Sequence, residues 1–311
     1  MGRGSRGSEG EEQARAEASL RQIEAGGLPL AAQERLREVG RRKRFFTSDL
    51  STNEFLLTRE AAFRPLTQVM GSCFYHVGWQ WTPGSGGFGG GMNPVSGGAE
   101  SWELETQTEA WNEARRLALG RLSEEARLCG ADAVVGVRLT RGRYDWSQGV
   151  IEFVATGTAV ASERYELQDT PVLSNLSGQE FAALFRHGFW PAGLVAGTTV
   201  LYVIAGWQQQ QARFAFGGSR FQNQEFPDFT RGLYDARREA MLRATRQAHE
   251  RGAHGLLGVS IETSHEEREV DLGGGAKRTD LVLTLHVLAT AVFELEHKEE
   301  DPPVYVAVPL S

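Results

Sequence analysis

Residues 108–137 read TEAWNEARRLALGRLSEEARLCGADAVVGV, and residues 230–259 read TRGLYDARREAMLRATRQAHERGAHGLLGV. The two stretches align without a gap. Upstream, SDLSTNEF at residues 48–55 matches SNLSGQEF at residues 174–181. Downstream, TGTAV, which starts at Thr156, matches LATAV, which starts at Leu288. Matching blocks in the same order predict an internal repeat, so one kind of domain occurs twice in this chain.

The repeat divides the chain of 311 residues into four parts. We predict a first repeat at residues 45–165 and a second repeat at residues 166–296. A charged helical segment precedes them at residues 1–44, and an acidic linker with an extended tail follows at residues 297–311. This length is about twice that of a typical single-core domain, which agrees with two domains.

Each repeat begins with the same local signals. The pattern Ser-x-x-Glu stands at residues 51–54 and 177–180 and is typical of a capping box that opens a short helix. An apolar run follows at residues 65–81 and 191–207 and indicates a buried strand.

A long helix is predicted next in each repeat. Small and apolar residues recur there every three, four or seven positions, which is one face of a helical period. These positions are Leu104, Trp111, Ala114, Ala118, Leu122 and Ala126 in the first repeat and Leu233, Ala236, Ala240, Ala244 and Ala248 in the second. Gly130 and Gly252 are expected to end the two helices in the left-handed conformation.

Two strands complete each repeat, at residues 133–139 and 150–161 and at residues 255–261 and 281–293. The predicted unit is β-α-β-β, an α+β fold in which a helix lies on a small antiparallel sheet. Three strands are near the lower limit for an independently stable sheet. We therefore expect further burial, either between the repeats or against neighbouring chains.

ARLCGADAVVGV at residues 126–137, after a long helix and before ATGTAV at residues 155–160, resembles the YbjQ-like family, which carries a heavy-metal-binding label. The resemblance covers both repeats and is weaker in the second, where GAHG replaces GADA. It implies a chain fold similar to dodecin and a ring of five subunits. A homo-oligomer, specifically a pentamer, is therefore the expectation.

The two ends of the chain are candidates for contact with a protein partner. The helix-GG-L-helix pattern at residues 19–40 is similar to a SHOCT-type hairpin. The tail reads VYVAVPL at residues 304–310, and its valines favour an extended strand that docks on a sheet edge.

Composition excludes several classes of protein. The chain has 33 Lys and Arg against 40 Asp and Glu, a net charge of −7, whereas nucleic-acid-binding proteins usually carry a basic surface. Its most apolar window, residues 193–207, is shorter than the ~20 residues of a membrane-spanning helix. We expect a cytoplasmic protein with no nucleic-acid partner and no membrane span.

Cys73 and His76 are residue types that bind soft or borderline metal ions. On a strand, however, a separation of three residues places two side chains on opposite faces. Leu201 and Ile204 stand at the aligned positions of the second repeat. Packing in a core is therefore the competing interpretation for this pair.

Asp132 and His254 occupy the same place in the two repeats, the junction between the long helix and the next strand. They are the candidate ligand-binding pair, and with Cys73 and His76 they form the candidate metal set. The cofactor is otherwise unknown, with a divalent metal as the candidate. The competing interpretation is that Asp132 fastens a turn. His265 falls in a charged stretch that we predict to be a loop.

No catalytic motif pairs a nucleophile with a base, so we do not expect an enzyme. The leading hypothesis is a ring-forming protein whose tandem domains bind a ligand, with a heavy metal as the candidate. The second hypothesis is a structural or interaction scaffold without a small ligand. The third is an enzyme of unrecognised type.

Overall fold

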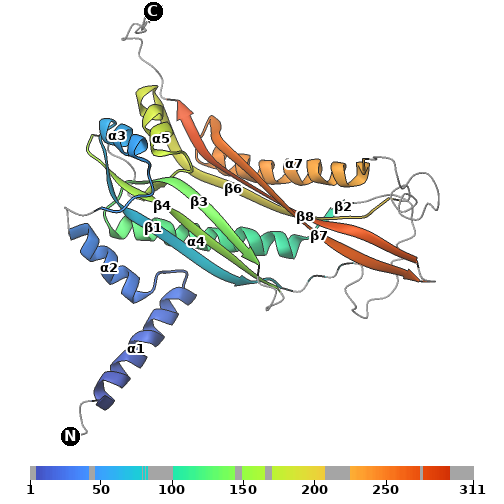
Figure 1. Ribbon diagram of the computed structural model, residues 1–311, viewed down its shortest axis with the longest axis horizontal. Helices are drawn as coiled ribbons and strands as arrows, with labels where there is room; N and C mark the ends of the chain where they lie inside the picture. The colour runs from blue at the N-terminus through green and yellow to red at the C-terminus, as the bar shows by residue number, and fades with distance from the viewer. Residues whose placement is uncertain are drawn as a thin grey trace, which may run out of the picture.

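The computed structural model describes residues 5–41, 46–78, 80, 82, 101–143, 149–164, 170–206, 225–273 and 276–294 (Figure 1). The helices are α1 (Ser5–Glu24), α2 (Leu30–Arg41), α3 (Thr52–Glu60), α4 (Glu105–Leu128), α5 (Gly178–Arg186) and α7 (Pro227–Glu250). The strands are β1 (Phe63–His76), β2 (Ser101–Glu103), β3 (Ala133–Arg143), β4 (Val150–Ser162), β5 (Val172–Leu173), β6 (Phe189–Val203), β7 (Gly255–Gly273) and β8 (Ala276–Glu294).

The strands form two four-stranded sheets, with strand orders β1-β4-β3-β5 and β2-β6-β8-β7. We call them the first sheet and the second sheet. Antiparallel pairing joins β1, β4 and β3 in one and β6, β8 and β7 in the other. Figure 1 shows the two sheets running side by side, with a long helix along each. The predicted mixed α+β class is confirmed.

Two short strands that the sequence did not predict join the two sheets. Strand β2 precedes α4 in the first repeat but pairs with β6 of the second sheet. Strand β5 precedes α5 in the second repeat but pairs in parallel with β3 of the first sheet. Each sheet therefore contains a strand from the other half of the chain, a feature that the predicted β-α-β-β unit lacks.

The predicted alanine faces of the two long helices are buried against the sheets, and glycine allows the close approach. A Cβ atom added to Gly71 on β1 would lie 2.1 Å from the carbonyl oxygen of Ala118 on α4. On Gly197 of β6 it would lie 2.0 Å from the carbonyl oxygen of Ala240 on α7. Leu233 is the exception to the predicted faces, since it is 40% exposed.

The helix ends match the sequence signals. Ser51 and Ser177 both form complete capping boxes at α3 and α5. Gly130 and Gly252 have φ angles of 75° and 70° after α4 and α7, which is the left-handed conformation expected there.

The β7–β8 hairpin is longer than predicted and corrects one expectation. His265 is not in a loop: it lies in β7 and pairs with Leu283 of β8. The polar stretch around His265 forms a strand because its backbone pairs with β8, whose residues Leu283 and Leu285 are buried. Tertiary pairing thus overrides the local polar composition.

The N-terminal helices α1 and α2 form the predicted hairpin, although α1 begins earlier, at Ser5. Leu28 and Leu36 are buried. Arg121 of α4 donates to the carbonyl oxygens of Ile23 and Gly27 at 3.0 and 3.2 Å. The hairpin is therefore fastened to the first repeat near the turn between α1 and α2.

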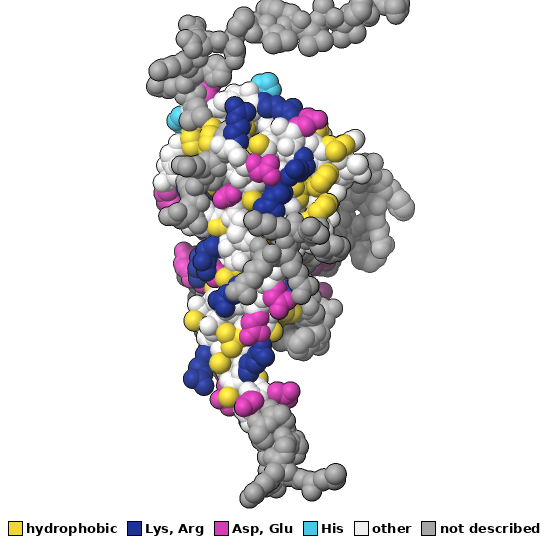
Figure 2. Space-filling model, turned by 90° about the vertical axis from the view of Figure 1, so that its left-hand side faces the viewer, with side chains coloured by type: hydrophobic (Ala, Val, Ile, Leu, Met, Phe, Trp, Pro, Cys, Tyr) yellow, Lys and Arg dark blue, Asp and Glu magenta, His cyan; other side chains and the backbone are white. Residues whose placement is uncertain are grey.

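Figure 2 shows basic and acidic side chains interspersed on one end of the molecule, with hydrophobic side chains between them. Within the described residues, no helix combines the length and the hydropathy needed to cross a membrane. The predicted tail strand at residues 304–310 lies outside the described residues.

Candidate functional site

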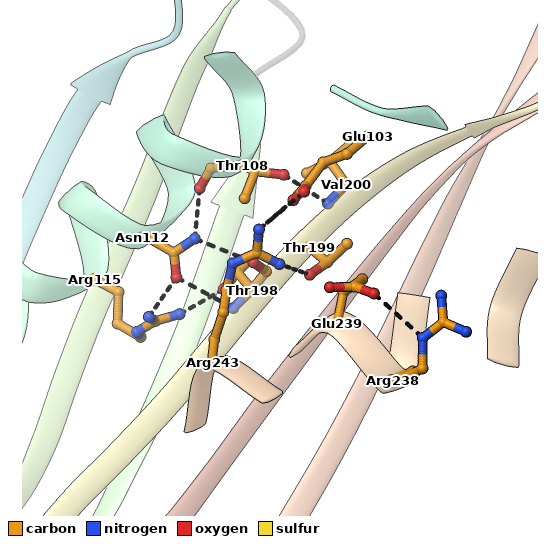
Figure 3. A network of polar contacts seen from close by, with 10 residues as sticks. All are labelled: Glu103, Thr108, Asn112, Arg115, Thr198, Thr199, Val200, Arg238, Glu239 and Arg243. Atoms are coloured by element: carbon orange, nitrogen blue, oxygen red, sulfur yellow. Dashed lines mark hydrogen bonds and ion pairs between the residues drawn. The ribbon is translucent and has the colours of Figure 1, made fainter. Parts of the chain in front are cut away.

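The first half of α4 lies along the outer edge of β6, where the first repeat meets the second (Figure 3). Leu104 donates its backbone N–H to the carbonyl oxygen of Val200 at 2.8 Å, and Thr108 Oγ1 accepts the N–H of Val200 at 2.9 Å. Asn112 exchanges two hydrogen bonds with Thr198: its Oδ1 accepts the Thr198 N–H at 3.2 Å, and its Nδ2 donates to the Thr198 carbonyl oxygen at 3.1 Å. Helix side chains therefore satisfy this strand edge, as a neighbouring strand would.

The same junction contains a second contact, in which the chain at β5 adds to the edge of β3. Ser174 donates its N–H to the carbonyl of Val134 at 2.9 Å, and Gly136 donates its N–H to the carbonyl of Leu176 at 2.7 Å. Gly136 has a φ angle of 64° and lies at a bulge in β3. We call the two contacts together the internal seam.

A threonine on each sheet anchors the segment that precedes each short helix. Thr290 Oγ1 lies 2.9 Å from Ser174 Oγ and donates to Asn175 Oδ1 at 2.7 Å. In the first repeat, Thr158 Oγ1 donates to Asp49 Oδ1 at 2.6 Å. The repeated blocks SDLS and SNLS are thus explained by the same hydrogen-bonded turn.

Two arginines from different repeats meet over β6 (Figure 3). Arg243 of α7 donates to Thr199 Oγ1 at 2.5 Å and to both carboxylate oxygens of Glu103 at 2.8 and 2.9 Å. Arg115 of α4 donates to Thr198 Oγ1 at 2.5 Å and to Asn112 Oδ1 at 2.6 Å. A carboxylate therefore compensates the charge of Arg243, whereas the acceptors of Arg115 are neutral.

Arg115 is buried, with 6% of its surface exposed. Burial, and then the nearby charge of Arg243, lower the pKa of its guanidinium to about 10. Among the residues that the structure describes, no carboxylate forms an ion pair with it. Arg115 is still protonated at neutral pH, so it is a buried cation without a protein counter-ion in this part of the chain.

His286 lies beside Arg115, on the other side of Thr198. Its Nδ1 lies 2.9 Å from Thr198 Oγ1, and its ring packs edge-on against Trp111 at 5.0 Å between centroids. Burial, and then the charges of Arg141 and Arg115, lower the pKa of His286 to about 2. The imidazole is therefore neutral at physiological pH.

A groove of about 1230 Å³ runs between α4 and α7 beside these arginines. Side chains of both repeats line it. The charged and amide residues along it include Asn112, Glu113, Arg115, Arg116, Arg243, Arg246, Gln247, Glu250 and Arg251. A groove with polar groups converging from two domains is a candidate for binding a small molecule.

Asp132 and His254 occupy equivalent places, as predicted. Asp132 Oδ2 accepts the N–H of Ser162 at 2.8 Å, and His254 Nδ1 accepts the N–H of Glu294 at 3.4 Å. Both side chains therefore bind the backbone at the end of the last strand of their repeat. This is the turn-fastening role that competed with ligand binding.

Cys73 and His76 both lie on β1, but Cys73 is buried among core residues and His76 is exposed. The strand register equates Cys73 with Thr199 of β6, which corrects the alignment to Leu201. Burial raises the pKa of the Cys73 thiol above its ordinary value. The thiol is therefore protonated at neutral pH, whereas a metal binds the thiolate.

These residues do not fit a ready-made heavy-metal centre. Within the described ranges, no three His, Cys, Asp or Glu side chains come together in a way that could hold a metal ion. The set of Cys73, His76, Asp132 and His254 stays a prediction. Calorimetric titration with zinc, copper or nickel, repeated on Asp132→Ala and His254→Ala variants, tests it.

Fold and site define a class: an α+β protein with an internal repeat, whose two halves exchange strands and meet at a polar seam. The chain belongs to the YbjQ-like family, also named UPF0145. The family described as "Putative heavy-metal-binding" matches residues 85–163. The resemblance predicted from the sequence is thus confirmed.

Relatives match different parts of the chain. Encapsulin nanocompartment protein Rv1762c of Mycobacterium tuberculosis is 35% identical over 252 residues, which is 78% of this chain and 86% of that protein. UPF0145 protein PTO0347 of Picrophilus torridus is 36% identical over 102 residues, or 32% of this chain and 81% of that protein. A UPF0145 protein of Clostridium perfringens is 43% identical over 61 residues, which is 20% of this chain and 56% of that protein.

No solved structure matches the chain. Neither the family description nor the names of these relatives denote a catalytic activity.

Sequence reasoning missed the residues at the internal seam. Arg115 stands beside the predicted alanine face and reads as a solvated helix residue, and Glu103 reads as part of the helix rather than of β2. One sequence signal pointed to the seam: a threonine stands at the same position of both repeats, as Thr108 and Thr230, and Thr108 is one of the seam residues. Only the position of α4 over β6 gives those residues partners.

Proposed function

We propose that this chain is a non-catalytic subunit that assembles head to tail with copies of itself and forms part of a protein nanocompartment. One observation carries the proposal. Apolar positions that are buried at the internal seam have repeat-equivalents on the outside of the molecule, and these equivalents are large, apolar and exposed.

The outer edge of β7 corresponds to the edge of β3 that receives β5. Leu257 is 40% exposed, whereas its equivalent Val135 is fully buried. Gly258 has a φ angle of 59° and lies at a bulge, as Gly136 does in β3. This edge thus has the shape and the apolar side chains of a strand acceptor.

The outer edge of β1 corresponds to the edge of β6 that α4 covers. Phe74 is 59% exposed, whereas its equivalent Val200 is fully buried. Met70 is likewise exposed, and its equivalent Ala196 is buried. A second copy of the chain could cover these side chains with the first half of its α7.

The segment that would pair with β7 is also exposed. Phe46 is 49% exposed, and its equivalent in β5, Val172, is 7% exposed. Leu233 on α7 is exposed where its equivalent on α4, Trp111, is buried. For each contact of the internal seam, one chain therefore carries a second, exposed set of both partners.

A contact between two different faces is heterologous, and it closes into a ring when the rotation per subunit allows. In such a ring, residues 46–50 of one chain pair with β7 of the next, and α7 of that next chain covers β1 of the first. Five chains of 34.2 kDa would place ten repeats in one ring of about 171 kDa. The pentamer and the cytoplasmic location predicted from the sequence are part of this proposal.

One relative supports the same function. The mycobacterial relative is named as an encapsulin nanocompartment protein, and it aligns with most of this chain. A nanocompartment requires protein subunits with complementary faces, which the two exposed edges supply.

The test introduces a charge on each face. Phe74→Glu and Leu257→Glu should each reduce a high-mass wild-type assembly to the monomer at 34.2 kDa in light scattering, with unchanged circular dichroism. Leu242→Glu is the matched control, because Leu242 is 46% exposed and its repeat-equivalent, Gly120, is exposed as well.

Mixing the two variants identifies a head-to-tail contact. Each variant keeps one intact face, so the mixture should form a single pair of about 68 kDa, twice the chain mass. A wild-type chain that stays monomeric at micromolar concentration would overturn the proposal. So would full-size assembly by both charged variants.

A further inference from the structure

We propose that the groove between α4 and α7 binds a small ligand through an oxyanion group, a phosphate or a carboxylate, held by Arg115 and Arg246. This site lies within one chain, so it does not depend on the proposed self-assembly. It also differs from the metal set, since its residues are cationic.

The first observation is the buried charge of Arg115. Its three hydrogen-bond acceptors are Thr198 Oγ1, Asn112 Oδ1 and the carbonyl oxygen of Ala196, at 2.5, 2.6 and 3.3 Å. All three are neutral. A buried guanidinium without a counter-ion is costly, whereas a bound anion would compensate it and form charge-assisted hydrogen bonds.

The second observation is the charge of the neighbours. Arg243 approaches Arg115 from the other repeat and already pairs with Glu103, so Glu103 does not serve Arg115 (Figure 3). His286, linked to Arg115 through Thr198, is held neutral. Arg243 is thus the nearby charge that acts on the Arg115 guanidinium, and it has the same sign, which favours an anion.

The third observation is the groove itself. Arg246 is exposed along it and forms no ion pair with any carboxylate among the described residues. Arg251, also on the groove, donates to the carbonyl oxygen of Leu194 at 2.6 Å. The side chain of Gln247 exchanges two hydrogen bonds with the backbone of Ala196 on β6, at 3.2 and 2.8 Å, and so links α7 to this strand beside the groove.

Guanidinium groups bind phosphates and carboxylates through paired hydrogen bonds, which defines the ligand class. The volume of about 1230 Å³ exceeds what one inorganic phosphate fills. We therefore expect a metabolite-sized molecule that presents its anionic group to Arg115 and extends along the groove.

The test is calorimetry on the full chain with inorganic phosphate, pyrophosphate and citrate, at constant ionic strength set with sodium chloride. Binding of one anion per chain is expected. Arg115→Met and Arg246→Gln should each weaken it about tenfold or more, since each removes a charge-assisted contact. Preference for pyrophosphate or for citrate separates a phosphate ligand from a carboxylate ligand.

Arg127→Met is the matched control, because Arg127 is an exposed arginine of the same helix and pairs with Glu124 away from the groove. It should leave anion binding unchanged. A second readout separates ligand binding from a structural role. In phosphate-free buffer, Arg115→Met should unfold at the same temperature as the wild type or higher, and only the wild type should gain thermal stability on adding pyrophosphate.

Two results would overturn the site. One is the absence of anion binding to the wild-type chain. The other is a lower unfolding temperature of Arg115→Met than of the wild type in phosphate-free buffer, which would identify a purely structural role for the guanidinium.

Discussion

The two repeats use the same contacts but have different neighbours. In the second repeat the edge of β6 is covered by α4, and Val200 is buried; in the first repeat the edge of β1 leaves Phe74 exposed. Conversely, β3 of the first repeat receives β5, whereas β7 of the second repeat is the last strand of its sheet. The two repeats therefore contact each other once, at the internal seam, and each repeat keeps one equivalent edge exposed. Whether the residue at a given position of the repeat is exposed depends on whether the other repeat covers it.

The largest expected effect on stability is at the internal seam, where Trp111 is buried, compared with the repeat-equivalent position Leu233, which is exposed. Trp111→Ala should lower the free energy of unfolding by about 4 kcal/mol, because the indole is buried against Phe153 and His286. Leu233→Ala, at the equivalent position, should change it by less than about 0.5 kcal/mol in a chain kept monomeric by Phe74→Glu. Urea unfolding measures both, and equal losses would contradict the comparison.

The next prediction concerns a contact that both repeats share. Gly71→Ala and Gly197→Ala should each cost about 3 kcal/mol, because the added Cβ collides with the backbone of the helix that crosses the strand. Gly120→Ala is the control: it meets nothing within 4 Å and should stabilise α4 by about 0.5–1 kcal/mol. Thermal unfolding of the three variants measures these changes in stability. A tolerated alanine at Gly71 alone would show that the helices pack differently in the two repeats.

A smaller difference in stability between the two repeats is expected when the anchoring threonines are replaced. Thr290→Val should cost about 2 kcal/mol, because it removes the hydrogen bonds between this hydroxyl and Ser174 and Asn175 inside the seam. Thr158→Val should cost about 1 kcal/mol in the monomer, since the segment that it holds is partly exposed. Amide exchange of residues 46–50 and 172–176 would report which segment is released. Release of both by either variant would contradict separate anchoring.

The smallest effect is pH-dependent. Glu125 Oε2 accepts the N–H of Met70 at 2.8 Å, and Gln247 makes the equivalent bond to Ala196. Burial raises the pKa of Glu125 above its ordinary value of 4.5, although the Met70 hydrogen bond and Arg35 act in the opposite direction. The folded state therefore binds this proton more tightly than the unfolded state does.

It follows that stability is lost as the pH rises from about 4.5 through the raised pKa. Glu125→Gln should remove this loss and add about 1 kcal/mol at neutral pH. Gln247→Glu should introduce a similar slope in the second repeat. Urea unfolding between pH 4 and pH 8 measures both, and parallel pH profiles for wild type and Glu125→Gln would refute the argument.

The sequence predicted most of what lies within a repeat. Capping boxes at Ser51 and Ser177, terminal glycines at Gly130 and Gly252, and alanine faces on α4 and α7 are local patterns with a direct physical cause. The repeat itself then predicted that both halves fold alike. These features depend on residues close in sequence, so periodicity and turn chemistry suffice to predict them.

The sequence could not predict what crosses between the repeats. Strands β2 and β5 are short and have partners in the other sheet, so no local pattern marks them. Within the second repeat, His265 lies in a strand because the next strand along the chain, the apolar β8, pairs with it. The candidate groove also needed the structure, since Arg115 and Arg243 are far apart in the chain and meet only where α4 crosses β6.

By itself, then, the sequence determined the mixed α+β class and the apolar helix faces, because short-range periodicity sets which side of each element is apolar. Tertiary structure alone decided which edges are covered, which apolar residues stay exposed and which arginine is buried. These properties follow from long-range pairing between the repeats, and identical local signals in both halves, such as the capping boxes, hold no information about that pairing.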